Sequence, residues 1–112
     1  MSQYQKGLEG EQLAEEYLGL LGFQVVKRRH RSRHGEIDLI AKKGGLLYFI
    51  EVKYRAEGRL GEGLAGITPQ KRVRMKDAIR DYLAGSPRAY RLACLEITRA
   101  GILLREDVLH EN

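Results

Sequence analysis

Three carboxylates and one lysine are spaced so that a single β-hairpin would bring them together. Residues 35–53 read GEIDLIAKKGGLLYFIEVK, in which two apolar strands flank a Gly-Gly pair. Paired glycines favour a tight turn with positive φ angles. In that register Asp38 lies opposite Glu51 and Glu36 lies opposite Lys53, with the side chains of each pair on the same face.

The two faces of this hairpin differ in chemistry. The second face begins with apolar residues near the turn and ends with the four charged ones, so both faces are expected to be covered. Charged groups on a covered face are costly unless they are paired, hydrated or bound to a metal. A divalent cation would neutralise the acidic excess; a cross-strand ion pair at a solvated sheet edge is the alternative. The first face is apolar or aromatic throughout, with Ile37, Leu39, Ala41, Tyr48, Ile50 and Val52.

The basic residues form two clusters within a net charge of +5. Such clusters are typical of proteins that bind a polyanion, most often nucleic acid; a solvated charged surface is the alternative. Because the first cluster leads directly into the acidic hairpin, we favour a polyanion held over a metal site. The first cluster comprises Lys27, Arg28, Arg29, Arg31 and Arg33, and the second comprises Lys71, Arg72, Arg74 and Lys76.

Length and composition indicate one globular domain over residues 1–112. The chain has 43% hydrophobic and 31% charged residues, which argues against a disordered chain. No apolar run approaches the ~18 residues that a membrane span needs, and residues 1–10 lack the apolar core of a signal peptide. Cys94 is the only cysteine, which excludes an intramolecular disulfide and a cysteine-rich zinc site. We therefore expect a cytoplasmic protein without a membrane partner.

An apolar stripe at helical spacing predicts a helix over residues 7–21, stopped by the glycine that follows. Glu11 falls at the margin of this stripe. It could join the carboxylate cluster, or it could be an ordinary first-turn glutamate favoured by the helix dipole. A short strand is expected over residues 23–27, and the basic segment up to residue 34 is either a loop or an extension of that strand. The stripe comprises Ala14, Tyr17, Leu18 and Leu21.

The second half of the chain predicts one more helix and two more strands. Four glycines in residues 54–66 suggest a mobile loop beside the site. Thr68 and Pro69 are expected to start the helix as its N-cap and first residue. Strands are expected over residues 90–98 and 102–108. The order is therefore α-β-β-β-α-β-β, an α/β fold with a central mixed sheet flanked by helices.

These motifs together resemble a known nuclease superfamily. The spacing of Glu11, Asp38 and Glu51-x-Lys53, with a helix after it, is similar to the PD-(D/E)xK superfamily and its restriction-endonuclease-like core. More narrowly, the segments GEIDLIA, FIEVKYR and TPQKRVR resemble the small bacterial YraN family, over nearly the whole chain. The pair GEIDLIA and EVK is specific for this family, whereas a lone D…ExK pattern is weak.

The resemblance implies metal-dependent hydrolysis of nucleic-acid phosphodiester bonds. Asp38 and Glu51 would hold Mg²⁺ or Mn²⁺ through oxygen ligands, and Glu11 would support the cation directly or through water. Lys53 would orient the attacking water and stabilise charge that develops on the phosphate. Glu36 would support the site from outside or pair with Lys53.

The resemblance also implies a substrate held by its phosphates. Arg55 of the FIEVKYR segment and Lys71, on the sheet-facing side of its helix, would join the other basic residues in this role. DNA is favoured over RNA, on branched or processed strands, and a homodimer is left open. The alternative function is a nucleic-acid-binding module that retains the nuclease fold without catalysis.

Overall fold

The computed structural model describes residues 3–54, 68–86 and 88–106, with residues 3–9 described by their backbone alone. Within these residues, helices and strands follow the predicted order α-β-β-β-α-β-β. They are α1 (Gln3–Leu20), β1 (Gln24–Ser32), β2 (Gly35–Lys43), β3 (Leu46–Tyr54), α2 (Pro69–Leu83), β4 (Tyr90–Thr98) and β5 (Gly101–Glu106).

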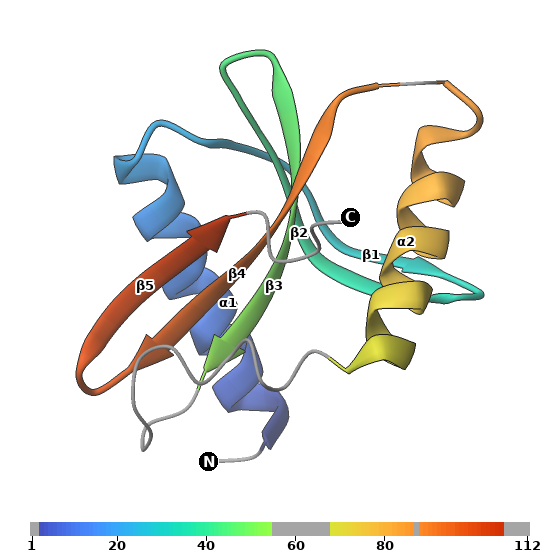
Figure 1. Ribbon diagram of the computed structural model, residues 1–112. Helices are drawn as coiled ribbons and strands as arrows, with labels where there is room; N and C mark the ends of the chain where they lie inside the picture. The colour runs from blue at the N-terminus through green and yellow to red at the C-terminus, as the bar shows by residue number, and fades with distance from the viewer. Residues whose placement is uncertain (1–2, 55–67, 87, 107–112) are drawn as a thin grey trace.

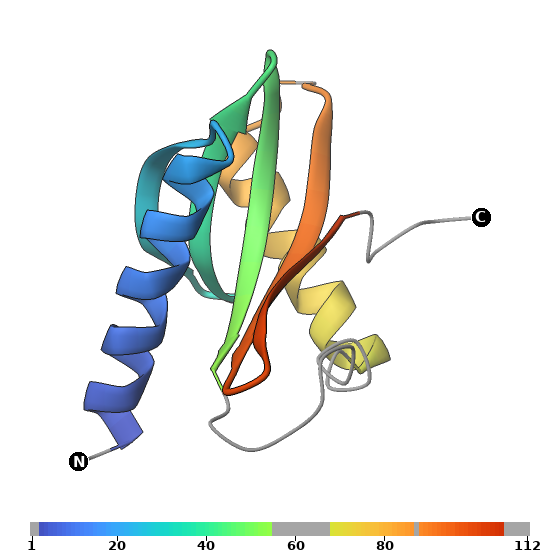
Figure 2. The same ribbon diagram turned by 90° about the vertical axis from the view of Figure 1, so that its left-hand side faces the viewer.

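The strands form one mixed sheet in the order β1-β2-β3-β4-β5. All neighbours are antiparallel except β3 and β4, which run parallel. Parallel neighbours need a crossover, and α2 lies between them in the chain. The sheet separates the two helices, with α1 on one face and α2 on the other (Figures 1 and 2). In Figure 1, β3 ends and α2 begins at the same end of the molecule, at the bottom of the view.

Each face of the sheet carries its own apolar cluster. Fully burying a Leu, Ile or Phe side chain contributes about 1.5–3 kcal/mol, so both helices hold the hairpin in place. This confirms that both faces of the hairpin are covered. The cluster under α1 contains Ala14, Leu18, Phe23, Leu39, Ala41, Tyr48, Ile50, Ala93, Leu95 and Ile97. The cluster under α2 contains Ile37, Ile40, Leu47, Phe49, Met75, Ala78, Ile79, Leu92 and Cys94.

The hairpin turn has the predicted geometry. Gly44 and Gly45 have φ angles of 59° and 81°, which glycine adopts without the steric cost of a Cβ atom. The ladder between β2 and β3 runs from the pair Lys43–Leu46 to the pair Leu39–Ile50, in the expected register. The register therefore follows from the Gly-Gly turn.

The ladder stops before the charged residues, and here the sequence prediction is wrong. The expected cross-strand pair of Glu36 with Lys53 is absent, because the β2–β3 ladder ends at the pair Leu39–Ile50; on its other side Glu36 lies opposite Arg31 of β1. Ile37 packs under α2 rather than under α1. The strand is irregular at this point: Arg29 has a φ of 50°, and the β1–β2 ladder skips it and the facing residue Asp38. Alternation is broken there, so residues beyond it change faces.

Two further elements differ from expectation. The helix α1 begins at Gln3 rather than at residue 7, so Glu11 lies in its middle and the first-turn dipole explanation for Glu11 is wrong. The strand β1 continues through the basic segment to Ser32, which settles the open choice between loop and strand extension. The helix α2 starts as predicted, with Thr68 Oγ1 accepting a hydrogen bond from the backbone N–H of Lys71 at 3.1 Å.

Some predictions fall outside the described residues. They concern Arg55, most of the glycine-rich segment 54–66, and the end of the last strand at residue 108. In the part of the chain that the structure describes, the helices are too short or too polar to cross a membrane.

Candidate active site

Asp38 lies where strands β2 and β3 separate. Beyond the last ladder pair, Leu39–Ile50, the Oδ2 atom of Asp38 accepts a hydrogen bond from the backbone N–H of Val52 at 2.7 Å. The carboxylate thus satisfies a strand donor that the ladder no longer pairs. The side chain therefore sits in the seam between the strands, where groups from both faces of the sheet reach it.

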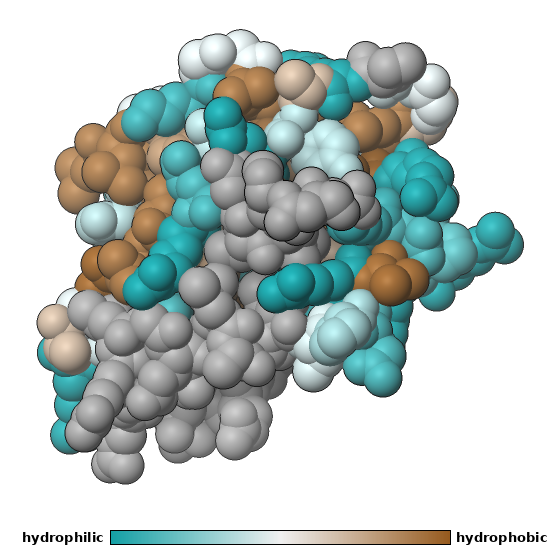
Figure 3. Space-filling view, viewed as in Figure 1, coloured by the Kyte–Doolittle hydropathy of each residue, from teal (hydrophilic) through white to brown (hydrophobic). Residues whose placement is uncertain are grey.

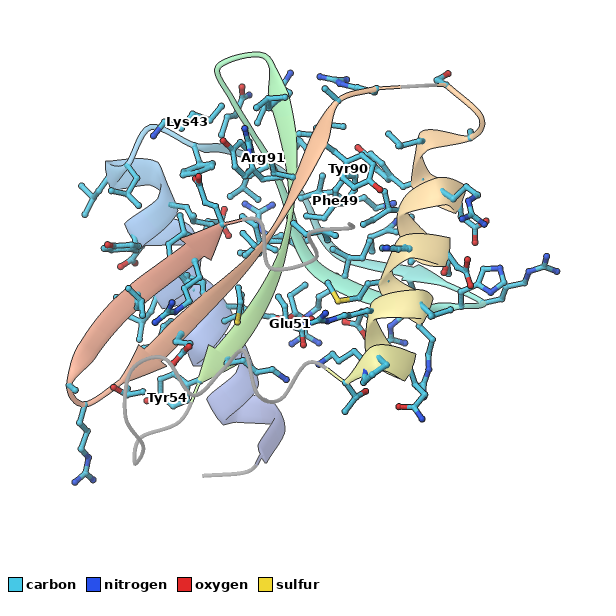
Figure 4. All side chains as sticks on the ribbon, viewed as in Figure 1. Lys43, Phe49, Glu51, Tyr54, Tyr90 and Arg91 are labelled. Carbon is cyan, nitrogen blue, oxygen red and sulfur yellow. The ribbon has the colours of Figure 1, made fainter. Side chains whose placement is uncertain are left out.

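Glu51 precedes Val52 on β3 and faces α2, and only 7% of its surface is exposed. Its Oε1 atom lies 2.5 Å from Nζ of Lys71, in the first turn of α2. The same oxygen lies 3.4 Å from Nζ of Lys53 on β3. Figure 4 shows Glu51 in the space between β3 and the first turns of α2. Strands β2 and β3 and helix α2 thus each supply charged groups to one cluster.

The two carboxylates of this cluster interact unfavourably. Burial and then the charge of Glu51 raise the pKa of Asp38 to about 7, although the hydrogen bond from Val52 opposes this shift. Glu11 and Glu36 raise the pKa of Asp38 by smaller amounts. A carboxylate with a raised pKa beside a second carboxylate is the arrangement that a bound cation would relieve.

The two lysines beside Glu51 differ in how firmly they hold a proton. Burial, together with the nearby ammonium of Lys71, lowers the pKa of Lys53, and Glu51 opposes this change. Burial is the largest single influence on Lys71 and acts to lower its pKa, but the hydrogen bonds to Glu51 and Lys53 and the charges of Glu51 and Asp38 together outweigh it, so the pKa of Lys71 is raised. Lys71 is therefore held as an ammonium, whereas Lys53 gives up its proton more readily.

Glu11 approaches the seam from α1, but an arginine holds it. Its Oε2 atom accepts a hydrogen bond from Nε of Arg29 at 2.8 Å. The neighbouring Arg28 binds both carboxylate oxygens of Glu15 on the same helix. Successive strand residues normally point to opposite faces, and the positive φ of Arg29 explains why both arginines reach α1. A hollow of about 310 Å³ lies here, lined by Glu11, Gln12, Glu15, Arg28, Arg29 and Leu39.

The other predicted phosphate contacts are spread around the cluster. Lys27 turns toward α2, with its Nζ atom 6.0 Å from the centre of the Tyr82 ring. Arg31 lies 3.5 Å from Glu36, and Arg33 projects from the turn between β1 and β2. The side of α2 that faces away from the sheet is mostly hydrophilic (Figure 3). It includes the exposed residues Arg72 and Arg74.

The donor chemistry fits a hard divalent cation at Asp38 and Glu51, because carboxylate oxygens are the ligands that Mg²⁺ prefers. Burial and the neighbouring charge of Glu51 raise the pKa of Asp38, and a bound cation would balance the negative charge of these two carboxylates. Among the described residues, no three His, Cys, Asp or Glu side chains are grouped closely enough to hold a metal ion together, so direct ligation by Glu11 beside Asp38 and Glu51 is not seen and support through water stays a prediction. The Glu11 carboxylate instead accepts a hydrogen bond from Arg29.

Two residues near the cluster were not singled out from the sequence. Glu96 is 1% exposed and lies beside Lys53 across the parallel β3–β4 ladder. The sequence feature that could have pointed to Glu96 is that it is the one acidic residue within the otherwise apolar strand segment LACLEI. Gly10 packs against Tyr54, where an added Cβ would come within 2.7 Å of the Tyr54 Cβ atom. Such a close approach depends on tertiary packing, and the sequence carries no signal for it.

Comparisons with known proteins agree with the resemblance seen in the motifs. Residues 10–109 match the model of a family described as "Uncharacterised protein family UPF0102". A UPF0102 protein of Nitrosococcus oceani is 42% identical over 89 residues, which cover 80% of this chain and 72% of the relative. One of Helicobacter pylori is 47% identical over 79 residues, covering 70% of this chain and 67% of the relative. One of Chlorobium phaeobacteroides is 42% identical over 77 residues, covering 69% of this chain and 61% of the relative.

A family match of this extent, joined to relatives at about 40% identity, is decisive for membership. The chain belongs to the uncharacterised protein family UPF0102, the YraN family.

Proposed function

We propose that this protein is a nuclease that hydrolyses nucleic-acid phosphodiester bonds with Mg²⁺ or Mn²⁺ as its cofactor. One observation carries the proposal: Asp38, Glu51 and Lys53 form one half-buried cluster in which the pKa of Asp38 is raised and that of Lys53 is lowered. Perturbed titratable groups that gather at one place are typical of catalytic sites.

In this proposal Asp38 and Glu51 hold the cation, and Glu11 supports it through water. The bound cation supplies Lewis-acid chemistry, since it polarises the phosphate and favours deprotonation of the attacking water. Lys53 donates hydrogen bonds to that water and to the phosphate. Its lowered pKa suits it to exchange a proton during the reaction. Glu36 lies outside the cluster, paired with Arg31.

The substrate is proposed to be DNA rather than RNA, held through its phosphates. Exposed positive charge is available on strand β1, on the turn that follows it and on helix α2. It is supplied by Arg31, Arg33, Arg72 and Arg74. Lys27 and Arg28 extend this charge along β1, although Arg28 also binds Glu15. Phosphate contacts of this kind position a strand without reading its sequence, which suits a substrate recognised by shape, such as branched DNA.

A cleavage screen tests the proposal. Branched, single-stranded and duplex DNA and RNA are incubated with the protein and Mg²⁺ or Mn²⁺, with EDTA as the metal-free arm. We expect cleavage that EDTA abolishes and that Lys53→Met lowers by roughly 10²- to 10⁴-fold, the usual contribution of a general acid or base. Lys42→Met, which removes an exposed lysine near the hairpin turn, is the matched control and should keep wild-type activity.

The outcome of this screen also separates the proposed function from its alternative. Binding of nucleic acid without metal-dependent cleavage of any substrate would favour a non-catalytic binding module that retains the fold. Cleavage that persists undiminished in Lys53→Met would contradict the assignment of the catalytic lysine.

A further inference from the structure

Lys71 does not extend toward solvent, where a phosphate contact would be expected. Its Nζ atom lies 2.5 Å from Oε1 of Glu51, inside the carboxylate cluster. Its backbone is fixed as well, because its N–H bonds the N-cap residue Thr68 at 3.1 Å. The side chain is partly buried, whereas its neighbours Arg72 and Arg74 are exposed. Lys71 is thus the residue of the first turn of α2 whose charge is directed inward.

The position of this ammonium matters because Glu51 is also a proposed metal ligand. Two buried carboxylates without a nearby positive charge are strongly disfavoured. Lys71, assisted by Lys53 at 3.4 Å, provides that charge in the protein alone. A divalent cation on the same carboxylate would lie within a few ångströms of the ammonium, and their repulsion in a partly buried site is large. The ammonium and the cation therefore compete for Glu51.

We propose that Lys71 is an internal cation that occupies Glu51 in the metal-free protein and is displaced when a divalent cation binds. This inference rests on the proposed function, because it requires Asp38 and Glu51 to bind the metal. The displaced ammonium becomes available to a substrate phosphate beside Arg72 and Arg74. Metal and polyanion then bind with positive coupling, since each favours the state in which Lys71 has left Glu51.

The test is the affinity for Mg²⁺ or Mn²⁺ measured by titration calorimetry without nucleic acid, so that no turnover is involved. Lys71→Met keeps the length of the side chain and removes its charge. We expect this variant to bind the metal roughly tenfold more tightly, as the loss of a charged hydrogen-bond partner from Glu51 predicts. Lys71→Gln, which retains a hydrogen-bond donor without charge, should also bind more tightly and provides a second variant if the first does not fold.

Arg72→Met is the matched control, because it removes the same charge from the same turn but from an exposed side chain. Its metal affinity should equal that of wild type. An equal gain in Arg72→Met and Lys71→Met would overturn the inference, since it would reflect overall charge rather than competition at Glu51. Unchanged affinity in the Lys71 variants would overturn it too.

A further variant, Glu51→Gln, separates failure of the inference from failure of the proposed function. If wild type binds the metal, Glu51→Gln does not, and the Lys71 variants match wild type, the site stands and the competition is refuted. If wild type and Glu51→Gln bind metal equally weakly, the proposed metal site is refuted and the inference falls with it.

Discussion

Asp38 is the residue on which the proposed chemistry depends, and its environment sets its charge. The carboxylate is tied to the backbone of β3 through Val52 and lies beside Glu51. It therefore cannot turn away from the second negative charge without losing a hydrogen bond. Burial and this charge together hold its pKa near neutrality. Near neutral pH, the Asp38 carboxyl group of the metal-free protein is therefore partly protonated and partly ionised.

This raised pKa predicts a pH dependence of stability in the metal-free protein. The folded-state pKa is about 7, well above the ordinary value of 3.8, so the folded state binds more protons than the unfolded chain between these pH values. The contribution of Asp38 to the free energy of unfolding therefore falls as the pH rises from about 4 to about 7. Asp38→Asn removes this titration while keeping an acceptor for the N–H of Val52.

The measurement is urea unfolding of both proteins between pH 5 and pH 8 without metal. Wild type should lose stability relative to Asp38→Asn with rising pH, by at most a few kcal/mol, since each unit of pKa shift corresponds to about 1.4 kcal/mol. A difference that stays constant over this range would show that Asp38 does not titrate there.

The residues proposed for the site were singled out from the sequence, but their contacts could be predicted only in part. The Gly-Gly turn predicts the register because a two-residue turn fixes which strand residues face each other. The place where the ladder ends was not predictable. It coincides with the bond from the N–H of Val52 to Asp38, and with the positive φ of Arg29 on the neighbouring strand, and both form only in the folded sheet. For the same reason the sequence did not foresee that Lys71 binds Glu51.

The helices position the site from opposite faces of the sheet. Helix α2 is anchored by its Thr68 cap and by an apolar stripe, and both features could be read from the sequence. Helix α1 was predicted to start several residues later, because its first turns carry no apolar stripe of their own. Its docking depends on a contact without a sequence signal, the approach of Gly10 to Tyr54. That contact lies next to Glu11.

Two glycines of α1 give a matched test of this docking. Alanine at either position should favour the helix by up to about 1 kcal/mol. At Gly19 nothing lies within 4 Å of an added Cβ, so Gly19→Ala should be neutral or stabilising. At Gly10 the added Cβ would lie 2.7 Å from the Tyr54 Cβ atom, which cannot move without its strand. Gly10→Ala should therefore destabilise the protein by about 1–3 kcal/mol.

Thermal or urea unfolding of the two variants compares these costs directly. Equal stability of Gly10→Ala and Gly19→Ala would show that α1 does not pack closely on β3 at this point.

At the scale of the whole molecule, apolar and charged residues divide the sheet along its length. Most of the hairpin residues in both apolar clusters lie next to its turn, where the β2–β3 ladder is complete, although Ile37 and the partly buried Val52 and Tyr54 extend the clusters past the last ladder pair. The charged cluster lies where the ladder has ended and α2 begins. The cluster combines the carboxylates of Asp38 and Glu51 with the ammonium groups of Lys53 and Lys71.

The stability of the whole protein can report on the metal site, because the proposed ligands come together only in the folded protein. A ligand that binds only the folded state adds to its stability, by about 2.7 kcal/mol at a hundredfold excess over its dissociation constant. If Asp38 and Glu51 hold the cation, Mg²⁺ should stabilise wild type in this way. Asp38→Asn should lose most of the gain, because it removes one of the two charged ligands.

The most direct test is therefore a set of thermal melts of wild type and Asp38→Asn, each with EDTA and with excess Mg²⁺, at pH 8. We predict that metal-free Asp38→Asn is as stable as wild type or more stable, since it is relieved of one buried charge beside Glu51. Mg²⁺ should raise the melting temperature of wild type and have little effect on the variant. A metal-free variant that is less stable than wild type, with its full response to Mg²⁺ retained, would contradict the assignment of Asp38 and Glu51 as a metal site.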